Sequence, residues 1–255
     1  MTSAPRPADD WERHWEDYSS IAEVSPAQRY RRLLSFKRLE LDASGGRVVD
    51  IGSGQGDFAA ELRRRSPNSQ VLGLEFSQSG IDVSARKVPD ATFLRRDLLQ
   101  PDEHPVEYQD WGTHAVCIEV LEHVDEPETL LANAAAYLAP GCKLVVTVPG
   151  GPMSQLDHHI GHRQHFTPEK LRSLLTRAGL EVETATTAGF PFFNLYRMVV
   201  VMRGRKLVDD VSVSNEGASS RLARAAMRVF GILFRLNTAS GRWGWQIVAV
   251  ARKPP

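Results

Sequence analysis

A glycine-rich loop between two apolar runs limits the possible folds of this chain more than any other feature. The loop, residues 52–56, reads GSGQG and follows the apolar run 48–51. Residues 58–65 then carry apolar side chains at helical spacing, and a second apolar run, 71–74, ends at Glu75. This order predicts a strand, a tight turn, a helix and a second strand. The stretch therefore predicts a βαβ unit of a parallel sheet.

A unit of this kind also predicts where a ligand binds. The glycine loop and Glu75 should lie at the carboxyl edge of the sheet, where open α/β folds bind nucleotides. Gly52, Gly54 and Gly56 let a ligand approach the backbone closely, because they have no Cβ. Glu75 follows the loop by about 20 residues, a spacing at which a carboxylate accepts hydrogen bonds from ribose hydroxyls. The same carboxylate would repel a ribose phosphate, which disfavours NADP.

The positions around the glycines distinguish between cofactors. A dinucleotide site has the pattern G-x-G-x-x-G, but Asp57 occupies the position of its third glycine, and Asp50 precedes the loop. Acidic residues on both sides suit a pyrophosphate poorly, whereas they suit ammonium and sulfonium groups. The pattern therefore favours a cationic nucleoside, with a nicotinamide-dependent oxidoreductase as the alternative on the same sheet.

The run VVDIGSGQG at 48–56 resembles the first motif of the class I S-adenosylmethionine-dependent methyltransferases. Further pieces follow in the family's order, over about residues 45–150: Glu75, the pair Asp97-Leu98, EVLEHV at 119–124 and LVVTVP at 144–149. The resemblance implies an α/β fold with a Rossmann-like, doubly wound sheet of seven strands. The last strand would be antiparallel, between the fifth and sixth strands, with a C-terminal helical cap inserted before it.

The resemblance also implies S-adenosylmethionine as the cofactor and assigns residues to it. Glu75 would hold the ribose, Phe76 would lie against the adenine, and the Asp97-Leu98 pair would contact the adenine amine and ring. Tyr18 belongs to an aromatic stripe at 11–18 that would either form a lid over the cofactor or pack in the core. The full set expected at the cofactor is Asp50, Gly52, Ser53, Gly54, Gly56, Glu75, Phe76, Asp97, Leu98, Glu119 and Tyr18.

A hydroxyl must lose its proton to accept a methyl group. A base that takes the proton, or a metal that lowers the pKa of the hydroxyl, should therefore lie near the sulfonium. Glu119, Glu122 and His123 follow the fourth predicted strand at i, i+3 and i+4, and they share one face if a helix begins there. A second cluster follows the fifth strand, where His158, His159, His162 and His165 occur in one loop. Both clusters should lie at the carboxyl edge of the sheet.

The motif EVLEHV, with a later histidine before Phe-Thr, resembles the metal site of the small-RNA 3′-terminal 2′-O-methyltransferases. Ubiquinone-pathway O-methyltransferases have a related site. This resemblance implies one divalent cation held by Glu119, Glu122, His123 and His165. Carboxylates suit Mg²⁺ or Mn²⁺, and imidazoles suit Zn²⁺ or iron. Relatives without a metal carry the same motif, so the alternative is that His123 or a loop histidine acts as a general base. The catalytic candidates are His123, His165 and Glu122.

Composition limits the partners. The chain has 255 residues, with 31 basic and 31 acidic side chains, and this zero net charge argues against a nucleic-acid partner. Cys117 and Cys142 lie in apolar runs, as reduced core cysteines do, which predicts a cytoplasmic protein. The N-terminus lacks the features of a signal peptide, and no apolar run approaches the ~18 residues of a membrane span.

Four segments follow from these patterns: N-terminal helices over 1–43, the cofactor-binding core over 44–189, a cap over 190–243, and the final strand and tail over 244–255. The cap contains a basic amphipathic helix, 221–236, with Leu222, Ala226, Val229, Leu233 and Leu236 on one face. This face should pack on its own domain, and peripheral contact with a membrane or a partner is the alternative.

Together these patterns predict an enzyme that methylates a small molecule, most readily at oxygen, as a monomer or homodimer. An RNA 2′-O-methyltransferase, an N- or C-methyltransferase and a non-catalytic S-adenosylmethionine-binding protein are the alternatives. Aromatic residues at the start of the cap, Phe190, Phe192, Phe193 and Tyr196, suggest a flat or apolar acceptor.

Overall fold

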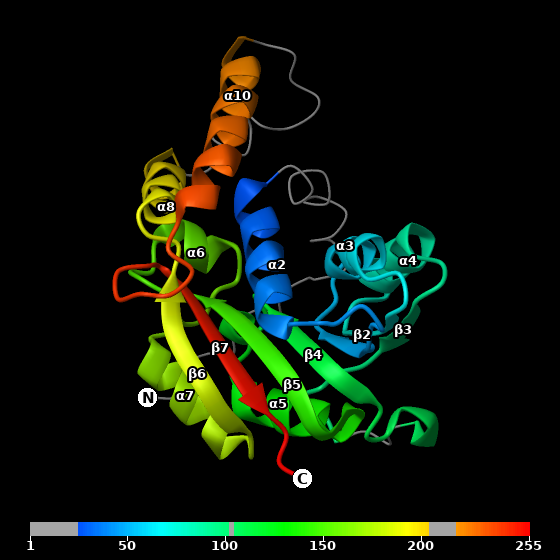
Figure 1. Ribbon diagram of the computed structural model, residues 1–255. Helices are drawn as coiled ribbons and strands as arrows, with labels where there is room; N and C mark the ends of the chain where they lie inside the picture. The colour runs from blue at the N-terminus through cyan, green and yellow to red at the C-terminus, as the bar shows by residue number, and fades with distance from the viewer. Residues whose placement is uncertain (1–24, 102–104, 204–217) are drawn as a thin grey trace.

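The computed structural model describes residues 25–101, 105–203 and 218–255 (Figure 1). Its seven strands form one sheet in the order β3-β2-β1-β4-β5-β7-β6. Their bounds are β1 Arg47–Ile51, β2 Gln70–Glu75, β3 Thr92–Arg95, β4 Gly112–Ile118, β5 Leu138–Pro149, β6 Glu181–Ala188 and β7 Gln246–Arg252. Strand β7 is antiparallel to both β5 and β6, and the other pairs are parallel. The predicted fold class is confirmed.

Helices cover both faces of the sheet. They are α2 Pro26–Leu39, α3 Asp57–Arg65, α4 Gln78–Lys87, α5 Pro127–Ala134, α6 Gln155–His159, α7 Pro168–Arg177, α8 Phe192–Arg203 and α10 Ala218–Leu233. Short 3-10 helices are η1 Val106–Tyr108, η2 Leu121–His123, η3 Ala135–Tyr137 and η4 Phe234–Leu236. Within the described residues, no helix combines the length and apolar character needed to cross a bilayer. The predicted helix at 11–18, with Tyr18, lies outside the described residues.

The alternation of side chains along β1 explains why two helical layers form. Val49 and Ile51 join the core cluster that includes residues of α5 and α7, whereas Val48 joins the cluster that includes residues of α2 and α3. Successive strand residues point to opposite faces, so a strand with apolar side chains on both faces must be covered on both. The result is the doubly wound arrangement, with both predicted cysteines buried and reduced.

Strand β5 begins earlier than the sequence predicts. The apolar run starts at Lys143, but the strand begins at Leu138, and Pro140 and Gly141 belong to it rather than to a turn before it. Leu138 pairs with Gly112, and the register shifts between Gly112 and His114. This irregularity accommodates the proline and the positive φ of Gly141, which is 77°.

The residues between β6 and β7 contain α8 and α10. Figure 1 shows α10 rising beside α2, beyond the carboxyl ends of the parallel strands. A third apolar cluster, which joins α2, α8, α10 and η4, includes Ala27, Phe193, Tyr196, Met227 and Phe234. The packing face of α10 therefore differs from the predicted one. Met227 is buried, whereas Val229 is 54% and Leu236 68% exposed, because the aromatic rings of α2 and α8 approach the Met227 side. The side chain of Leu222 lies outside the described residues.

Candidate active site

A cavity of about 810 Å³ opens at the carboxyl ends of β1, β2 and β4. The glycine loop, α2, α8, the segment after β4 and the segment between α6 and α7 form its walls. Among the predicted cofactor residues, those that line it are Asp50, Gly52, Ser53, Gly54, Glu75, Phe76, Asp97, Leu98 and Glu119. Gly56 lies at the start of α3 without lining the cavity. The topology thus brings these residues, which are distant in sequence, to one place.

Glu75 connects the glycine loop to the second strand. Its carboxylate accepts a hydrogen bond of 2.7 Å from the backbone N–H of Gly54 and one of 3.0 Å from that of Ser77. Glu75 therefore fixes the glycine loop at the end of β2.

Gly52 allows the tight turn at the end of β1. Its φ is 72°, and a Cβ built there would lie 2.4 Å from a methyl group of Val120. The backbone N–H of Gly52 donates to the carbonyl oxygen of Leu74 at 2.8 Å. Any side chain here would push the loop away from the segment that follows β4.

Asp50 is a buried acid beneath the cavity. Its side chain is 2% exposed, and within the described residues its Oδ2 has no hydrogen-bond partner. Burial, together with the smaller effects of the charges of Glu75 and Asp57, raises the pKa of Asp50 to about 8. A cationic ligand would supply the missing partner and favour the ionised carboxylate. This orphaned oxygen fits the ammonium group of S-adenosylmethionine better than it fits a phosphate.

Glu119 belongs to a buried polar network that closes the cavity near α2. Arg31 Nη2 lies 2.9 Å from Glu119 Oε2, and Gln246 Nε2 donates to Glu119 Oε1 at 2.7 Å. Arg31 Nε also donates to Gln246 Oε1 at 2.9 Å. Sequence analysis missed both partners. Gln246 could have been noticed from the sequence, because it is a single polar residue at the start of a mainly apolar strand.

The predicted helical face of Glu119, Glu122 and His123 is wrong. Glu119 has a left-handed φ of 57°, and only Leu121–His123 form a helical turn, of the 3-10 type. The physical reason is that Glu119 is held at the strand end, where its N–H donates to Thr147 at 2.9 Å and its carboxylate bonds to Arg31 and Gln246. The side chain of Glu119 therefore contacts Arg31 and Gln246 and does not share a helical face with Glu122 and His123.

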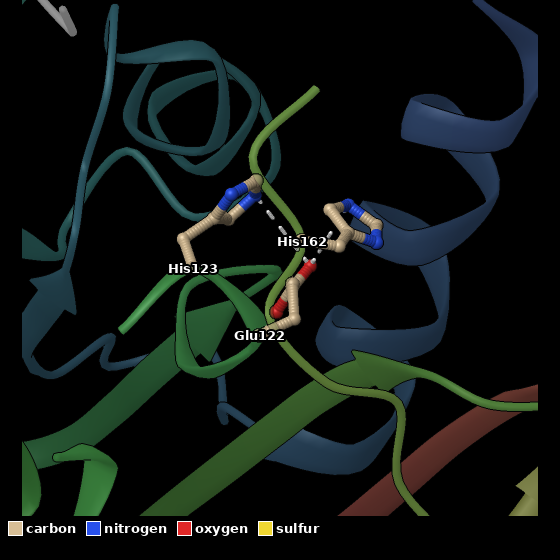
Figure 2. Close-up of side chains that lie close together, drawn as sticks. All are labelled: Glu122, His123 and His162. Carbon is tan, nitrogen blue, oxygen red and sulfur yellow. Dashed lines mark ion pairs between the residues drawn. The ribbon is translucent and has the colours of Figure 1, made fainter. Parts of the chain in front are cut away.

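Glu122 lies between two imidazoles (Figure 2). Its Oε1 is 3.9 Å from His123 Nε2 and 3.9 Å from His162 Nε2. Glu122 is fully buried, and neither carboxylate oxygen has a hydrogen-bond partner among the described residues. Burial, reinforced by the charge of Glu119, raises the pKa of Glu122 well above its usual value. No described side chain donates a hydrogen bond to Glu122, so a proton of its own or a nearby cation would stabilise this buried acid.

His165 lies in a second, adjoining group. Its Nε2 is 3.1 Å from His162 Nδ1 and 3.8 Å from Asp157 Oδ1, and its Nδ1 is 3.1 Å from the carbonyl oxygen of Gly151. Burial lowers the pKa of His162 to about 2 and also lowers that of His165, so both rings are neutral. Thr167 caps α7 just after His165, accepting from the backbone N–H of Lys170 at 3.2 Å.

The four predicted metal ligands do not form one group in the structure. The groups of potential ligand atoms that lie close together are Glu122 with His123 and His162, and Asp157 with His162 and His165. Glu119 belongs to neither group. His162, which links the two, was only one of four histidines in the sequence argument. The other two loop histidines, His158 and His159, are exposed on α6.

Asp157 anchors the histidine loop to the helix α8. Arg197 Nη2 lies 3.0 Å from Asp157 Oδ1 and 3.2 Å from Oδ2. The backbone N–H and the hydroxyl of Ser154 also donate to Oδ2, at 2.8 Å and 2.7 Å. Sequence analysis assigned no role to Asp157 or Arg197, because their pairing depends on how α8 packs.

Comparison with known proteins agrees with this geometry. A family described as Methyltransferase domain matches residues 25–185. A ubiquinone biosynthesis O-methyltransferase of Aeromonas salmonicida is 25% identical in an alignment of 178 residues that covers 62% of this chain and 74% of that enzyme. A demethylmenaquinone methyltransferase of Thermus thermophilus is 30% identical in an alignment of 140 residues that covers 49% of this chain and 62% of that enzyme. The chain thus covers less than two thirds of the second relative.

Solved structures share the fold at lower identity. Phosphoethanolamine N-methyltransferase 2 of Haemonchus contortus, in complex with S-adenosyl-L-methionine, has a TM-score of 0.66 at 14% identity, covering 99% of this chain and 62% of that one. The cyclase SpnF has a TM-score of 0.63 at 18% identity, covering 100% of this chain and 98% of that one. With the strand order, the glycine loop and the family match all in agreement, the chain belongs to the methyltransferase domain family and is a class I S-adenosylmethionine-dependent methyltransferase.

Proposed function

We propose that this enzyme transfers the methyl group of S-adenosylmethionine to a hydroxyl of a small aromatic molecule, of the phenol or hydroquinone type. The observation that carries the proposal is His123 in the cavity wall, backed by the fully buried carboxylate of Glu122. A phenolic hydroxyl must lose its proton to attack the methyl group, and an imidazole with a carboxylate behind it can accept that proton. The name of the Aeromonas relative, a ubiquinone biosynthesis O-methyltransferase, agrees with an oxygen acceptor, and the name of the Thermus relative agrees with a quinone-type ring.

His123 is better placed than Glu122 to touch the acceptor. The His123 side chain is 14% exposed, whereas that of Glu122 is 0% exposed and is reached only through its neighbours. In the proposed reaction the acceptor oxygen forms a bond to the methyl carbon while the bond from sulfur breaks, and the hydroxyl proton passes to His123. The imidazolium that forms lies 3.9 Å from Glu122, so its positive charge favours the ionised form of that acid and is stabilised by it. The proton leaves to water after the product departs.

The charges around the cavity favour an acceptor without a phosphate or carboxylate group. Four of the arginines that line the cavity are paired with a carboxylate: Arg31 with Glu119, Arg32 with Asp57, Arg163 with Asp125 and Arg197 with Asp157. Arg96, which also lines it, donates to the hydroxyl of Tyr137 and to the carbonyl oxygen of Arg95. The wall near α8 adds Tyr196 and Val200, which are mostly apolar. An uncharged aromatic ring meets these conditions, because it needs no free cation and gains from apolar burial.

The donor atoms also fit a divalent metal. Two imidazoles and one carboxylate, from His123, His162 and Glu122, form a set that Zn²⁺ or iron accepts, and both carboxylate oxygens of Glu122 lack hydrogen-bond partners among the described residues. A bound metal would lower the pKa of the acceptor hydroxyl. We therefore keep metal assistance as part of the proposal, with His162 in place of the predicted Glu119 and His165.

The test is transfer of isotope-labelled methyl from S-adenosylmethionine to catechol and hydroquinone acceptors, with aniline and RNA oligomers in parallel. We expect label in the phenolic ethers alone. Substitution of His123 by Asn should lower kcat by about 10²-fold or more, while the same change at the exposed His158 should leave it unaltered. Label appearing only in aniline or RNA would refute the oxygen acceptor, and a chelator that abolishes transfer would favour the metal over the free base.

A further inference from the structure

Helix α10 and the short helix η4 that follows it carry two apolar strips, and only one of them is covered in the described part of the chain. Met227, Phe230 and Phe234 follow one another at i, i+3 and i+7 and join the third apolar cluster with α2 and α8. A second strip, Val229, Ile232 and Leu236, has the same spacing, but its side chains are 54%, 64% and 68% exposed. Large apolar residues at this spacing form a strip on one helical face, and such exposed strips mark interaction sites more often than single apolar surface residues do.

The neighbouring helix α8 continues this pattern. Leu195, Met198 and Met202 share one face, with side chains 48%, 47% and 77% exposed. The opposite face of α8 carries Tyr196 and Val200, which line the active-site cavity. We call the six exposed side chains on α8, α10 and the short helix η4 the exposed apolar face: Leu195, Met198, Met202, Val229, Ile232 and Leu236. One wall of the cavity is thus the inner side of a helix whose outer side is apolar.

Among the described residues of α8, α10 and the segment that leads to β7, the charged side chains are all basic. Arg228, Arg235 and Arg242 are exposed beside it, and within the described residues no carboxylate pairs with any of the three. Residues 189–203 and 218–245 include arginines but no aspartate or glutamate. Trp243, between Arg242 and the start of β7, is 72% exposed. Apolar side chains rimmed by arginines and an exposed tryptophan suit the boundary between lipid headgroups and acyl chains.

From this arrangement we infer that the exposed apolar face binds the surface of a membrane containing anionic phospholipids. The arginines supply charge complementarity to the headgroups, and the apolar strip enters the acyl boundary. A protein partner with a neutral surface would leave the arginines unmatched, and a second copy of this chain would bring like charges together. The inference does not depend on the acceptor, since binding to vesicles can be measured without any reaction.

The experiment is sedimentation of the full chain with vesicles of phosphatidylcholine alone, or with about one third phosphatidylglycerol. We expect binding to the anionic vesicles, little binding to the neutral ones, and release at about 0.5 M salt, where screening acts within a few ångströms. The double variant Val229→Glu with Ile232→Glu should bind at least about tenfold more weakly. Glutamate is a good helix former, so a loss of binding would not reflect loss of the helix, which circular dichroism also checks.

The matched control is Val106→Glu. Val106 is 85% exposed on η1, which precedes β4 and so lies at the opposite edge of the sheet, and the change should leave vesicle binding as it is. Arg228→Gln with Arg235→Gln should weaken binding to anionic vesicles. Equal binding to neutral and anionic vesicles would overturn the inference, as would unchanged binding of the Val229 and Ile232 variant. Self-association that this variant abolishes, without vesicle binding, would instead make the face a dimer interface.

Discussion

Arg31 of α2 and Glu119 at the end of β4 form an ion pair of 2.9 Å in which both side chains are about nine-tenths buried, at 10% and 9% exposure. The pair, completed by Gln246, connects the first described helix, the centre of the sheet and the last strand. It also fixes one wall of the cavity. Arg31 and Gln246, which lie outside the sequence motifs at 45–150, therefore help to shape the active site.

Removing one member of this pair should destabilise the protein strongly. Arg31→Met leaves the Glu119 carboxylate buried without its cation, and we expect a loss of about 3–5 kcal/mol in the free energy of unfolding. Adding Glu119→Gln should recover a large part of that loss, since the unpaired charge is then gone. Urea unfolding of the two single variants and the double variant measures the coupling. Additive losses would show that the two side chains do not interact.

Gly52→Ala should abolish cofactor binding. The new methyl group would lie 2.4 Å from Val120 at a φ of 72°, so the loop must move. Gly141→Ala is the matched control, because its φ is 77° and nothing lies within 4 Å of the added Cβ. That variant should lose only about 1–2 kcal/mol of stability, the cost of the left-handed backbone, and should bind S-adenosylmethionine normally. Calorimetric titration compares them, and equal affinities would contradict the role of Gly52.

The pKa of Asp50 makes the stability of the ligand-free protein depend on pH. The folded carboxyl keeps its proton up to about pH 8, whereas the unfolded one releases it near 3.8. Between these values the folded state binds more protons, so the contribution of Asp50 is full below pH 3.8 and is lost as the pH rises to about 8. Asp50→Asn should remove this decline, and its stability relative to the parent protein should grow with pH. Urea unfolding at several pH values tests it, with the exposed Glu107→Gln as control.

The sequence predicted the strands well, because each follows from a local apolar pattern, whereas their order came from the resemblance to the family. Val48, Val49 and Ile51 place apolar side chains on both faces of one strand, which already implies cover on both faces. The glycine loop and Glu75 then indicate the edge where ligands bind. These features depend on residues close in the chain. The family's topology supplied the position of β7.

The predicted chemistry was less accurate, because it depended on contacts between distant segments. Glu119 was assigned to a helical face, but Arg31 and Gln246 hold it elsewhere. Spacing could not distinguish His162 from the neighbouring histidines. Which histidine lies beside Glu122 depends on how the loop folds around Asp157. The exposed strip of α10 was likewise expected to pack, because sequence shows that a strip is apolar but not which of two strips meets α2.

The ion pair of Arg197 with Asp157 should position the acceptor without affecting the cofactor. It joins α8 to the segment that carries His162, and both side chains are nearly buried, at 10% and 2% exposure. We expect Arg197→Met to cost about 3–5 kcal/mol of stability and to raise the KM for the acceptor. The dissociation constant of S-adenosylmethionine should remain the same, because the glycine loop and Glu75 are unaltered. Arg177→Met provides the control, since its pair with Glu128 is exposed at 55% and 46% and should contribute less than about 1 kcal/mol. Equal stability losses in the two variants, or a parallel loss of cofactor affinity in the Arg197 variant, would contradict this role.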